Sequence, residues 1–406
     1  MNTKQTPNYT FALVIVIAVC FLIGFVTTMN NSMIESLKYA FNLDDTQGNL
    51  VNTAFYGAYA LSIPFAIMMN KIGYKSTLVL GLVVVACGFV ANYFGLTTVE
   101  GTNVYPVFLA CMFLVAMGVV MLQLVANPYV MVLGAPESGA FRMTLSQALN
   151  SVATTLAPMF ITFVILQKQP KEAVPSDIPM PFLGLGLFTL LLAAILFFLK
   201  LPNINEGEQA AEADGKIKQY KSSCFAYPHV WLGALGIFMY MGLEIGIPSM
   251  LPAYWVADPS LPGSATDYLP LYWGGMMVGR FVGAAIVSKF APRKLLAVCL
   301  ICGAICVGSS FFLPGMMGVY AMLAAGLFHS VMWPLIFNLG LQELGPHTKT
   351  ASGLINVGVL GGATLPVIMA LLIPQYGVGV AICMMFVYYA YELWFTAKGC
   401  RIGLDN

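Results

Sequence analysis

The residues that could do chemistry in this chain are mostly neutral amides inside apolar stretches. Gln123 and Asn127 interrupt the run LQLVANPYVMVLG, and Gln147 and Asn150 follow in the next apolar segment. Asn and Gln side chains both donate and accept hydrogen bonds, so they match the hydroxyls of a neutral sugar. A phosphate or carboxylate ligand would require paired Arg or Lys, whereas the apolar interior holds a single Arg, Arg280. The pattern therefore predicts a neutral, polyhydroxylated ligand.

Further polar and aromatic residues recur at corresponding depths along the chain. Aromatic rings such as Tyr272, Trp273 and Trp333 can stack against the apolar face of a pyranose. Each amide also has a structural alternative, because an amide inside a membrane can equally bridge two helices. The predicted ligand contacts are Asn30, Asn31, Gln123, Asn127, Gln147, Asn150, Tyr272, Trp273, His329, Trp333, Asn338 and Asn356.

Glu244, in the segment GLEIGIPS, is an acidic residue deep in an apolar stretch. An ionisable residue in that position is a candidate functional residue. Glu244 could carry a proton or serve as an oxygen ligand for Na+; alternatively, its carboxylate locks a pair of helices. We expect Arg280 to snorkel or to pair with a carboxylate such as Glu392. We expect His329 to be neutral and hydrogen-bonded, with a proton relay as the alternative.

Three other kinds of chemistry are not supported. His329 and Glu244 would form the acid/base pair of a membrane enzyme, but the chain has no HExxH or GxSxG motif, so we predict a non-enzyme without a cofactor. Cys299, Cys302 and Cys306 lie on one apolar helix without His or carboxylate neighbours, which indicates packing rather than a metal site. The formal net charge of +1 and the absence of a nucleic-acid-binding motif exclude a nucleic acid partner.

The elements that must position these residues are membrane-spanning helices. The chain of 406 residues is 59% hydrophobic and 9% charged, whereas soluble domains carry about 25% charged residues. A helix needs about 20 apolar residues to cross the bilayer. We predict an all-α membrane protein with twelve such helices, the first being retained rather than cleaved as a signal peptide. They begin near Phe11, Asn49, Ser76, Asn103, Arg142, Pro181, Pro228, Tyr268, Lys294, Gly318, Ala351 and Val378.

The distribution of Lys and Arg predicts the orientation of these helices. If the N terminus is cytoplasmic, 14 basic residues fall on the inner side and 3 on the outer side. This asymmetry follows the positive-inside rule. Both termini are therefore predicted to be cytoplasmic.

The chain divides into two similar halves. The polar segment 201–227 separates residues 1–200 from residues 228–406, and we interpret it as a cytoplasmic linker. Asn127 is followed 23 residues later by Asn150, and Trp333 is followed 23 residues later by Asn356, an offset of 206 residues between the halves. Two six-helix halves in a pseudo-twofold parallel repeat are the arrangement of the major facilitator superfamily, whose substrate site lies near the midplane between the halves.

Several segments resemble the fucose permease family of fucose/galactose:proton symporters, and in particular its bacterial glucose/galactose transporter branch. These segments include NNSMIESLKYAF, LQLVANPYVMVLGAPES, FRMTLSQALNS and YWGGMMVGRFVGAAIVSKFAP, and the resemblance covers about residues 11 to 397. It implies the twelve-helix facilitator fold, a hexose or deoxyhexose substrate, and coupling to H+ or Na+. It also implies a monomer in the lipid bilayer of a bacterial inner (plasma) membrane.

The chain departs from this family at two positions. Fucose permeases carry an aspartate in the first span and a glutamate four residues before the Asn-Pro pair, where Asn31 and Gln123 stand here. An amide keeps hydrogen bonds to sugar but cannot titrate. Glu244 occupies roughly the place in the second half that Asn31 holds in the first, so it is the candidate coupling residue. Because Na+ coupling occurs in the glucose/galactose branch, the resemblance favours Na+ over H+. A sugar uniporter and a transporter of another small neutral solute remain alternatives.

Overall fold

The computed structural model describes residues 10–41, 45–99, 101–134, 138–160, 179–199, 201 and 220–404. Within these ranges the chain forms helices and connecting turns, without strands. Residues 202–219 of the predicted linker lie outside the description. The side chains of residues 30–49 also lie outside it, and with them the predicted ligand contacts Asn30 and Asn31.

The first half crosses the membrane six times. Its helices are α1 (Thr10–Phe41), α2 (Asp45–Gly57), η1 (Ala58–Leu61), α3 (Ser62–Thr98), α4 (Val104–Val132), α5 (Gly139–Phe160) and α6 (Pro179–Phe198). The second and third crossings are joined within α3 at Gly73, whose φ of +80° interrupts the helix. Glycine adopts this backbone region without a steric penalty because it has no Cβ.

The second half uses shorter, interrupted helices. They are α8 (Pro228–Glu244), α9 (Gly246–Ala257), α10 (Ala265–Val287), α11 (Pro292–Phe312), α12 (Gly315–His329), α13 (Met332–Gly340), α14 (Thr348–Val357), η9 (Gly358–Leu360), α15 (Gly361–Tyr376) and α16 (Val378–Ala397). Pro334 lies in the first turn of α13, where its missing N–H costs no hydrogen bond. Pro128 and Pro366 instead lie inside α4 and α15.

The described residues confirm the prediction of twelve transmembrane helices. By length and apolar composition alone, nine helical stretches could span a membrane, one of which is the 46-residue stretch Thr53–Thr98. That stretch contains two crossings, which meet at Gly73. The more polar helices α5, with 22 residues, and α10, with 23 residues, supply the other two. The crossings begin within about one helical turn of the predicted positions.

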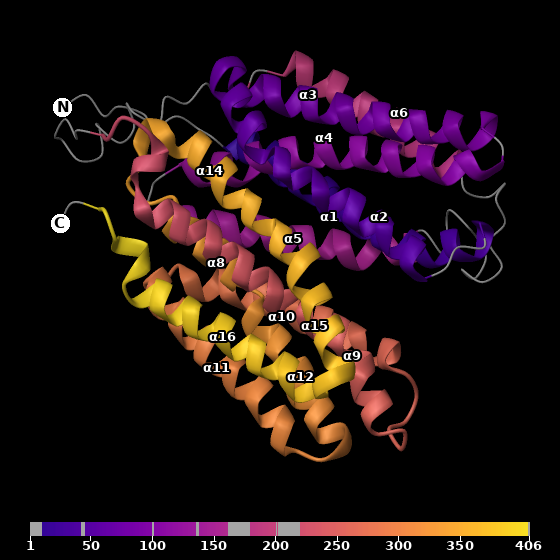
Figure 1. Ribbon diagram of the computed structural model, residues 1–406. Helices are drawn as coiled ribbons and strands as arrows, with labels where there is room; N and C mark the ends of the chain where they lie inside the picture. The colour runs from indigo at the N-terminus through magenta and orange to yellow at the C-terminus, as the bar shows by residue number, and fades with distance from the viewer. Residues whose placement is uncertain are drawn as a thin grey trace.

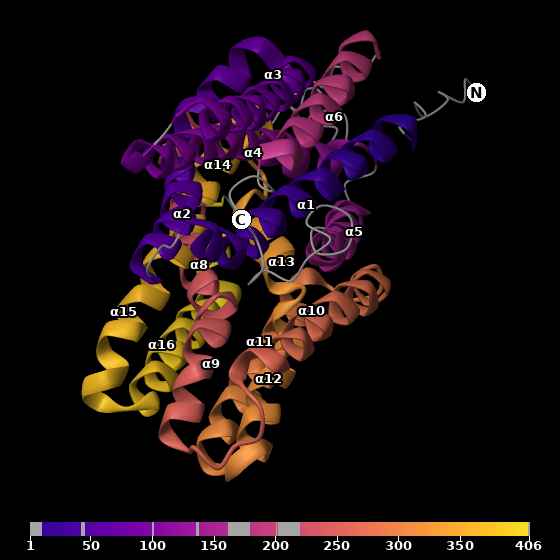
Figure 2. The ribbon, with the colours of Figure 1, turned by 90° about the vertical axis from the view of Figure 1, so that its right-hand side faces the viewer.

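The helices pack into two groups that correspond to the two sequence repeats. In the first group α3 packs against α4 and α6, and α1 packs against α5; in the second, α11 packs against α12 and α16, and α8 against α13, α15 and α16. Figure 1 shows the groups meeting near the end of the molecule at which α1 begins and α16 ends, and Figure 2, seen from the right-hand side of Figure 1, shows α1–α6 above and α9–α12 and α16 below. We call this end the terminal face. Away from it, the two groups diverge (Figure 1).

Helix α14 of the second half packs against α3 of the first half near the terminal face. The side-chain amide of Asn70 donates a hydrogen bond of 2.5 Å to the hydroxyl of Thr350. The Lys349 ammonium lies 4.6 Å from the centre of the Tyr74 ring, a cation–π contact. These contacts form a seam between the halves on one side of the membrane.

Gly353 allows the closest approach within this seam. A Cβ at position 353 would lie 2.4 Å from the Cβ of Ala66. We therefore expect Gly353→Ala to separate α14 from α3, because overpacking of this kind costs about 1–3 kcal/mol. Spin labels on Asn70→Cys and Thr350→Cys should show a longer distance in this variant. Gly274→Ala is the control, because a Cβ at that position meets no atom within 4 Å; equal distances in both variants would contradict the expectation.

Candidate functional site

Three of the predicted amides lie together in the first half, on α4 and α5. Gln123 and Asn127 share one face of α4 because they are four residues apart. The Tyr59 hydroxyl donates to the Gln123 side-chain oxygen at 2.8 Å, and the Gln147 amide nitrogen donates to the Asn127 side-chain oxygen at 3.4 Å. Tyr59 holds the Gln123 oxygen, so the Gln123 NH2 group points away from Tyr59 and can donate to a ligand. We call Tyr59, Gln123, Asn127 and Gln147 the amide cluster.

Asn150 and Asn356 occupy equivalent positions in the two repeats but have different surroundings. The Asn150 amide nitrogen donates to the backbone oxygen of Cys20 at 2.7 Å and so bridges α5 to α1. Asn356 is fully buried in α14, and neither atom of its amide has a hydrogen-bond partner within the described part of the chain. Asn150 thus bridges two helices, which is the structural alternative to ligand binding that the sequence left open.

The predicted aromatic contacts are dispersed. Trp333 is half-buried at the start of α13 and stacks on Phe337, with ring centres 4.9 Å apart and planes 12° apart. Trp273 is exposed on α10, whereas Tyr272 is fully buried. Asn338 is half-buried in α13. Tyr272 therefore acts as an interior residue in this structure and not as a stacking surface for a sugar.

Glu244 forms an ion pair with Arg280 in the second half. The two side chains, each 12% exposed, approach to 3.6 Å between the guanidinium and the Glu244 Oε1 atom. The Tyr240 hydroxyl lies beside the same carboxyl group. Arg280 thus pairs with a carboxylate, one of the two alternatives predicted from the sequence, but its partner is Glu244 and not Glu392, the example named there. Glu244 ends α8 at the break before α9, and this break brings its side chain next to α10.

Arg280 also connects this ion pair to the amide cluster. Its guanidinium donates to the backbone oxygen of Ser330 at 3.2 Å and to the hydroxyl of Ser151 on α5. The Ser151 hydroxyl in turn donates to the backbone oxygen of Gln147 at 3.0 Å. Ser151 is not among the residues predicted from the sequence, although its position one turn after Gln147 in FRMTLSQALNS places both residues on one face of α5.

His329 lies at the centre of a fully buried hydrogen-bonded network. Its Nδ1 atom is 2.8 Å from the Tyr272 hydroxyl, and its Nε2 atom is 2.5 Å from the Tyr389 hydroxyl. Tyr272 donates to the backbone oxygen of Glu244 at 3.1 Å, and Tyr240 donates to the backbone oxygen of His329 at 3.0 Å. With His329 neutral, Tyr389 donates to Nε2 and Nδ1–H donates to Tyr272, which gives each of these groups a partner. The expectation of a neutral, hydrogen-bonded histidine fits this arrangement.

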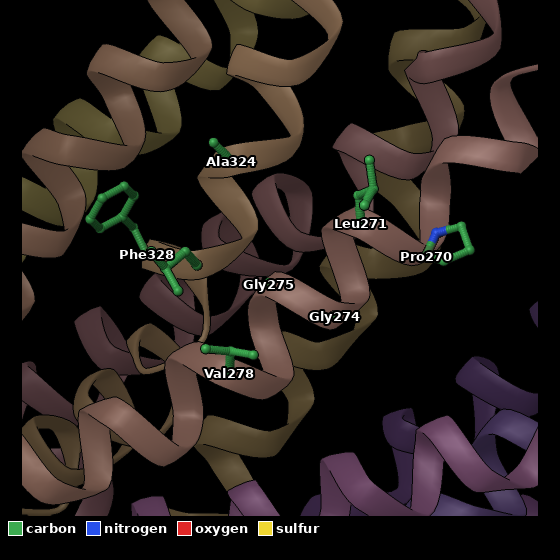
Figure 3. Close-up of a pocket in the computed structure, with 8 residues that line it drawn as sticks. Pro270, Leu271, Gly274, Gly275, Val278, Ala324 and Phe328 are labelled. Atoms are coloured by element: carbon green, nitrogen blue, oxygen red, sulfur yellow. The ribbon is translucent and has the colours of Figure 1, made fainter.

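An apolar groove of about 580 Å³ lies between α10 and α12, and Figure 3 shows the residues around it. Its walls include Leu271, Val278 and Leu327, which are exposed on the outer surface of the helices. No residue of the predicted ligand set lines this groove. A sugar needs hydrogen-bond partners, so the groove does not provide its site.

The comparisons with known proteins place this chain among membrane transporters. The Major Facilitator Superfamily profile matches residues 16–367. The glucose/galactose transporter of Brucella abortus is 37% identical over 98% of this chain and 97% of its own length. The L-fucose-proton symporter of Escherichia coli is 29% identical over 91% of this chain and 88% of its own length. A solved structure of the transporter FucP in its outward conformation has a TM-score of 0.81 at 26% identity, covering 97% of this chain and 99% of that one.

The buried network predicts a stability effect at Tyr272. The change Tyr272→Phe leaves the Nδ1–H group of His329 without its acceptor, and an unsatisfied buried polar group costs about 1–3 kcal/mol. We expect a lower thermal unfolding temperature in detergent. Tyr320→Phe, on an exposed side chain of α12, is the control and should leave the temperature unchanged. The same unfolding temperature in both variants would show that the Tyr272–His329 bond contributes little.

Proposed function

The chain belongs to the Major Facilitator Superfamily, and on this premise we propose that it imports a neutral monosaccharide of the glucose, galactose or fucose type by alternating access. As a member of this family it is a multi-pass membrane transporter and not an enzyme. We propose that uptake is coupled to a cation and that the protein acts as a monomer. The bacterial relatives and the positive-inside pattern support an inner membrane location with cytoplasmic termini.

One observation carries this proposal: a continuous set of contacts joins neutral amides to an ion pair. Hydrogen bonds and an ion pair connect Gln147, through its backbone oxygen, to Ser151, Arg280 and Glu244 across the two halves. The amide cluster offers donors and acceptors that suit sugar hydroxyls. The ion pair offers a charge that a bound cation can change. Sugar binding near Gln147 and cation binding at Glu244 would therefore act on the same connection between the halves.

The surroundings of Glu244 favour H+ over Na+ as the coupled cation. The resemblance in sequence favoured Na+, with Glu244 as a ligand. However, a Na+ ion at Glu244 would lie close to the Arg280 guanidinium, which is 3.6 Å from the carboxyl oxygen, and like charges repel at such distances. A proton instead neutralises Glu244 and weakens its attraction to Arg280, while Arg280 keeps its bonds to Ser151 and Ser330. The name of the Escherichia coli L-fucose-proton symporter agrees with this choice.

We propose that the structure represents the outward-facing state. The seam of α3 with α14 lies at the terminal face, and the helix groups diverge away from it (Figure 1). If the terminal face is cytoplasmic, the sugar path is closed toward the cytoplasm. The likeness to FucP in its outward conformation supports this interpretation.

Transport into proteoliposomes tests the function directly. Labelled glucose, galactose and fucose would be offered under an imposed pH gradient, an imposed Na+ gradient, and no gradient. We expect accumulation of at least one sugar under the pH gradient alone. Accumulation under the Na+ gradient alone would show that Na+, and not H+, is the coupled cation. Simple equilibration of the sugar in all three conditions would identify a uniporter. Failure of every sugar to enter would refute the sugar substrate.

We predict that Gln123→Ala weakens sugar binding. Loss of one or two hydrogen bonds to a hydroxyl should raise the Kd about tenfold, which corresponds to about 1.4 kcal/mol. The control is Tyr59→Phe, which removes the same bond between Tyr59 and Gln123 but leaves the amide in place. Isothermal titration of both variants separates the two effects. Equal losses of affinity would show that the Tyr59–Gln123 bond accounts for the whole effect, so that the Gln123→Ala result would not demonstrate a direct contact with sugar.

We predict that Glu244→Gln uncouples transport. The amide keeps the shape of the side chain but cannot gain or lose a proton, so sugar exchange across the membrane should continue while gradient-driven accumulation is lost. Asp258→Asn changes an exposed carboxylate that accepts hydrogen bonds from Ser260, and it should leave both activities unchanged. Normal gradient-driven sugar accumulation by the Glu244→Gln variant would show that Glu244 has only a structural role.

A further inference from the structure

Glu392 is a second acidic residue inside the helices of the second half, and the transport site described above does not use it. It lies on α16, five residues before the helix ends at Ala397, or roughly 8 Å from that end at about 1.5 Å per residue. Its side chain is 0% exposed. Helix α8 passes beside it: a Cβ on Gly236 would lie 3.3 Å from the Glu392 Oε1 atom.

Neither carboxyl oxygen of Glu392 has a hydrogen-bond partner within the described part of the chain. An ionised carboxylate buried without a partner is far more costly than a neutral one, so such a group takes up a proton. Even the neutral acid leaves a polar group unsatisfied, which costs about 1–3 kcal/mol. An apolar residue of similar size would avoid this cost, and the glycine at position 236 preserves space beside the carboxyl group.

Glu392 lies next to the buried hydrogen-bonded network around His329. Tyr389 precedes it by three residues and therefore shares its face of α16, and Tyr389 bonds to His329 at 2.5 Å. Gly236 likewise precedes Tyr240 by one turn of α8. Glu392 thus lies one turn closer to the terminal face than the layer formed by Tyr240, His329 and Tyr389.

No charged side chain on the helices packed around Glu392 is paired with its carboxyl group. The ionisable residues on α16 and on the helices packed against it, α8, α9, α11, α15 and η10, are His229, Tyr240, Glu244, Tyr254, Arg293, Lys294, Cys299, Cys302, Cys306, Tyr376, Cys383, Tyr388, Tyr389, Tyr391, Cys400 and Arg401. None of them is hydrogen-bonded to Glu392. Arg293 bonds instead to the backbone oxygens of Thr396 and Ala397 at the end of α16.

We propose that Glu392 is a second proton-binding site, distinct from Glu244. In the conformation described here its carboxyl group is neutral and sealed. When α8 and α16 move apart beside Gly236, water reaches the carboxyl group, which releases its proton to that water and becomes a carboxylate. When these two helices close again, the carboxylate takes a proton back before it is buried. The proposal extends the proton coupling proposed above, on which its role in transport rests.

Infrared spectroscopy of the reconstituted protein tests this site without any sugar. A protonated carboxyl group has a carbonyl band separate from that of a carboxylate, and the band shifts in D2O only if the proton exchanges. We expect Glu392→Gln to lose one such band at neutral pH. Asp258→Asn, which alters an exposed carboxylate, should lose none, and Glu244→Gln identifies the band of the other membrane acid.

The D2O shift then tests whether the buried proton exchanges with water. We expect the Glu392 band to shift in D2O, and to do so more slowly than the bands of exposed groups. Absence of a Glu392 band at neutral pH would overturn the proposal. A Glu392 band that never shifts in D2O would also overturn it. These outcomes do not depend on sugar uptake, so a failure of the proposed function is recognised separately by the transport assays.

Discussion

The guanidinium of Arg280 carries a positive charge inside the membrane, where an uncompensated charge is expensive. It is compensated from three directions: the Glu244 carboxyl group, the Ser330 backbone oxygen and the Ser151 hydroxyl. Only Ser151 belongs to the first half, so the charge is fully satisfied only when α5 and α10 lie together. This requirement couples the electrostatics of the second half to the relative position of both halves.

Close helix packing makes the arrangement around Arg280 possible. Gly279 and Gly283 lie on either side of it in α10, and a Cβ on either glycine would lie within 2.3 Å of an atom of Leu327 or Val331. Small residues at this spacing allow helix backbones to approach closely in a membrane. The approach brings Arg280 within hydrogen-bonding distance of the Ser330 backbone at the end of α12. The glycines therefore help to position the Arg280 side chain as well as allowing α10 and α12 to pack closely.

The sequence predicted the helices more completely than their contacts. Apolar length, basic loops and the 206-residue repeat identify the crossings because these properties are summed over about 20 residues each. The pairing of Gln147 with Asn127 agrees with the predicted cluster. The pairing of Arg280 with Glu244 was not predicted, because it depends on the break between α8 and α9. Single contacts of this kind depend on helix rotation and depth, which periodicity alone does not determine.

The two halves keep the same helix order but differ in their interior chemistry. Within the described residues, the candidate ligand groups of the first half are neutral, whereas the interior of the second half holds Glu244, Arg280, His329 and Glu392. A neutral site binds sugar without depending on pH, and an ionisable one responds to protons but binds a neutral ligand less selectively. In the proposed mechanism, the sugar-binding amides and the ionisable residues lie in different halves, so a contact between the halves must connect them. The contact of Arg280 with Ser151, one turn from Gln147, is the candidate for that connection.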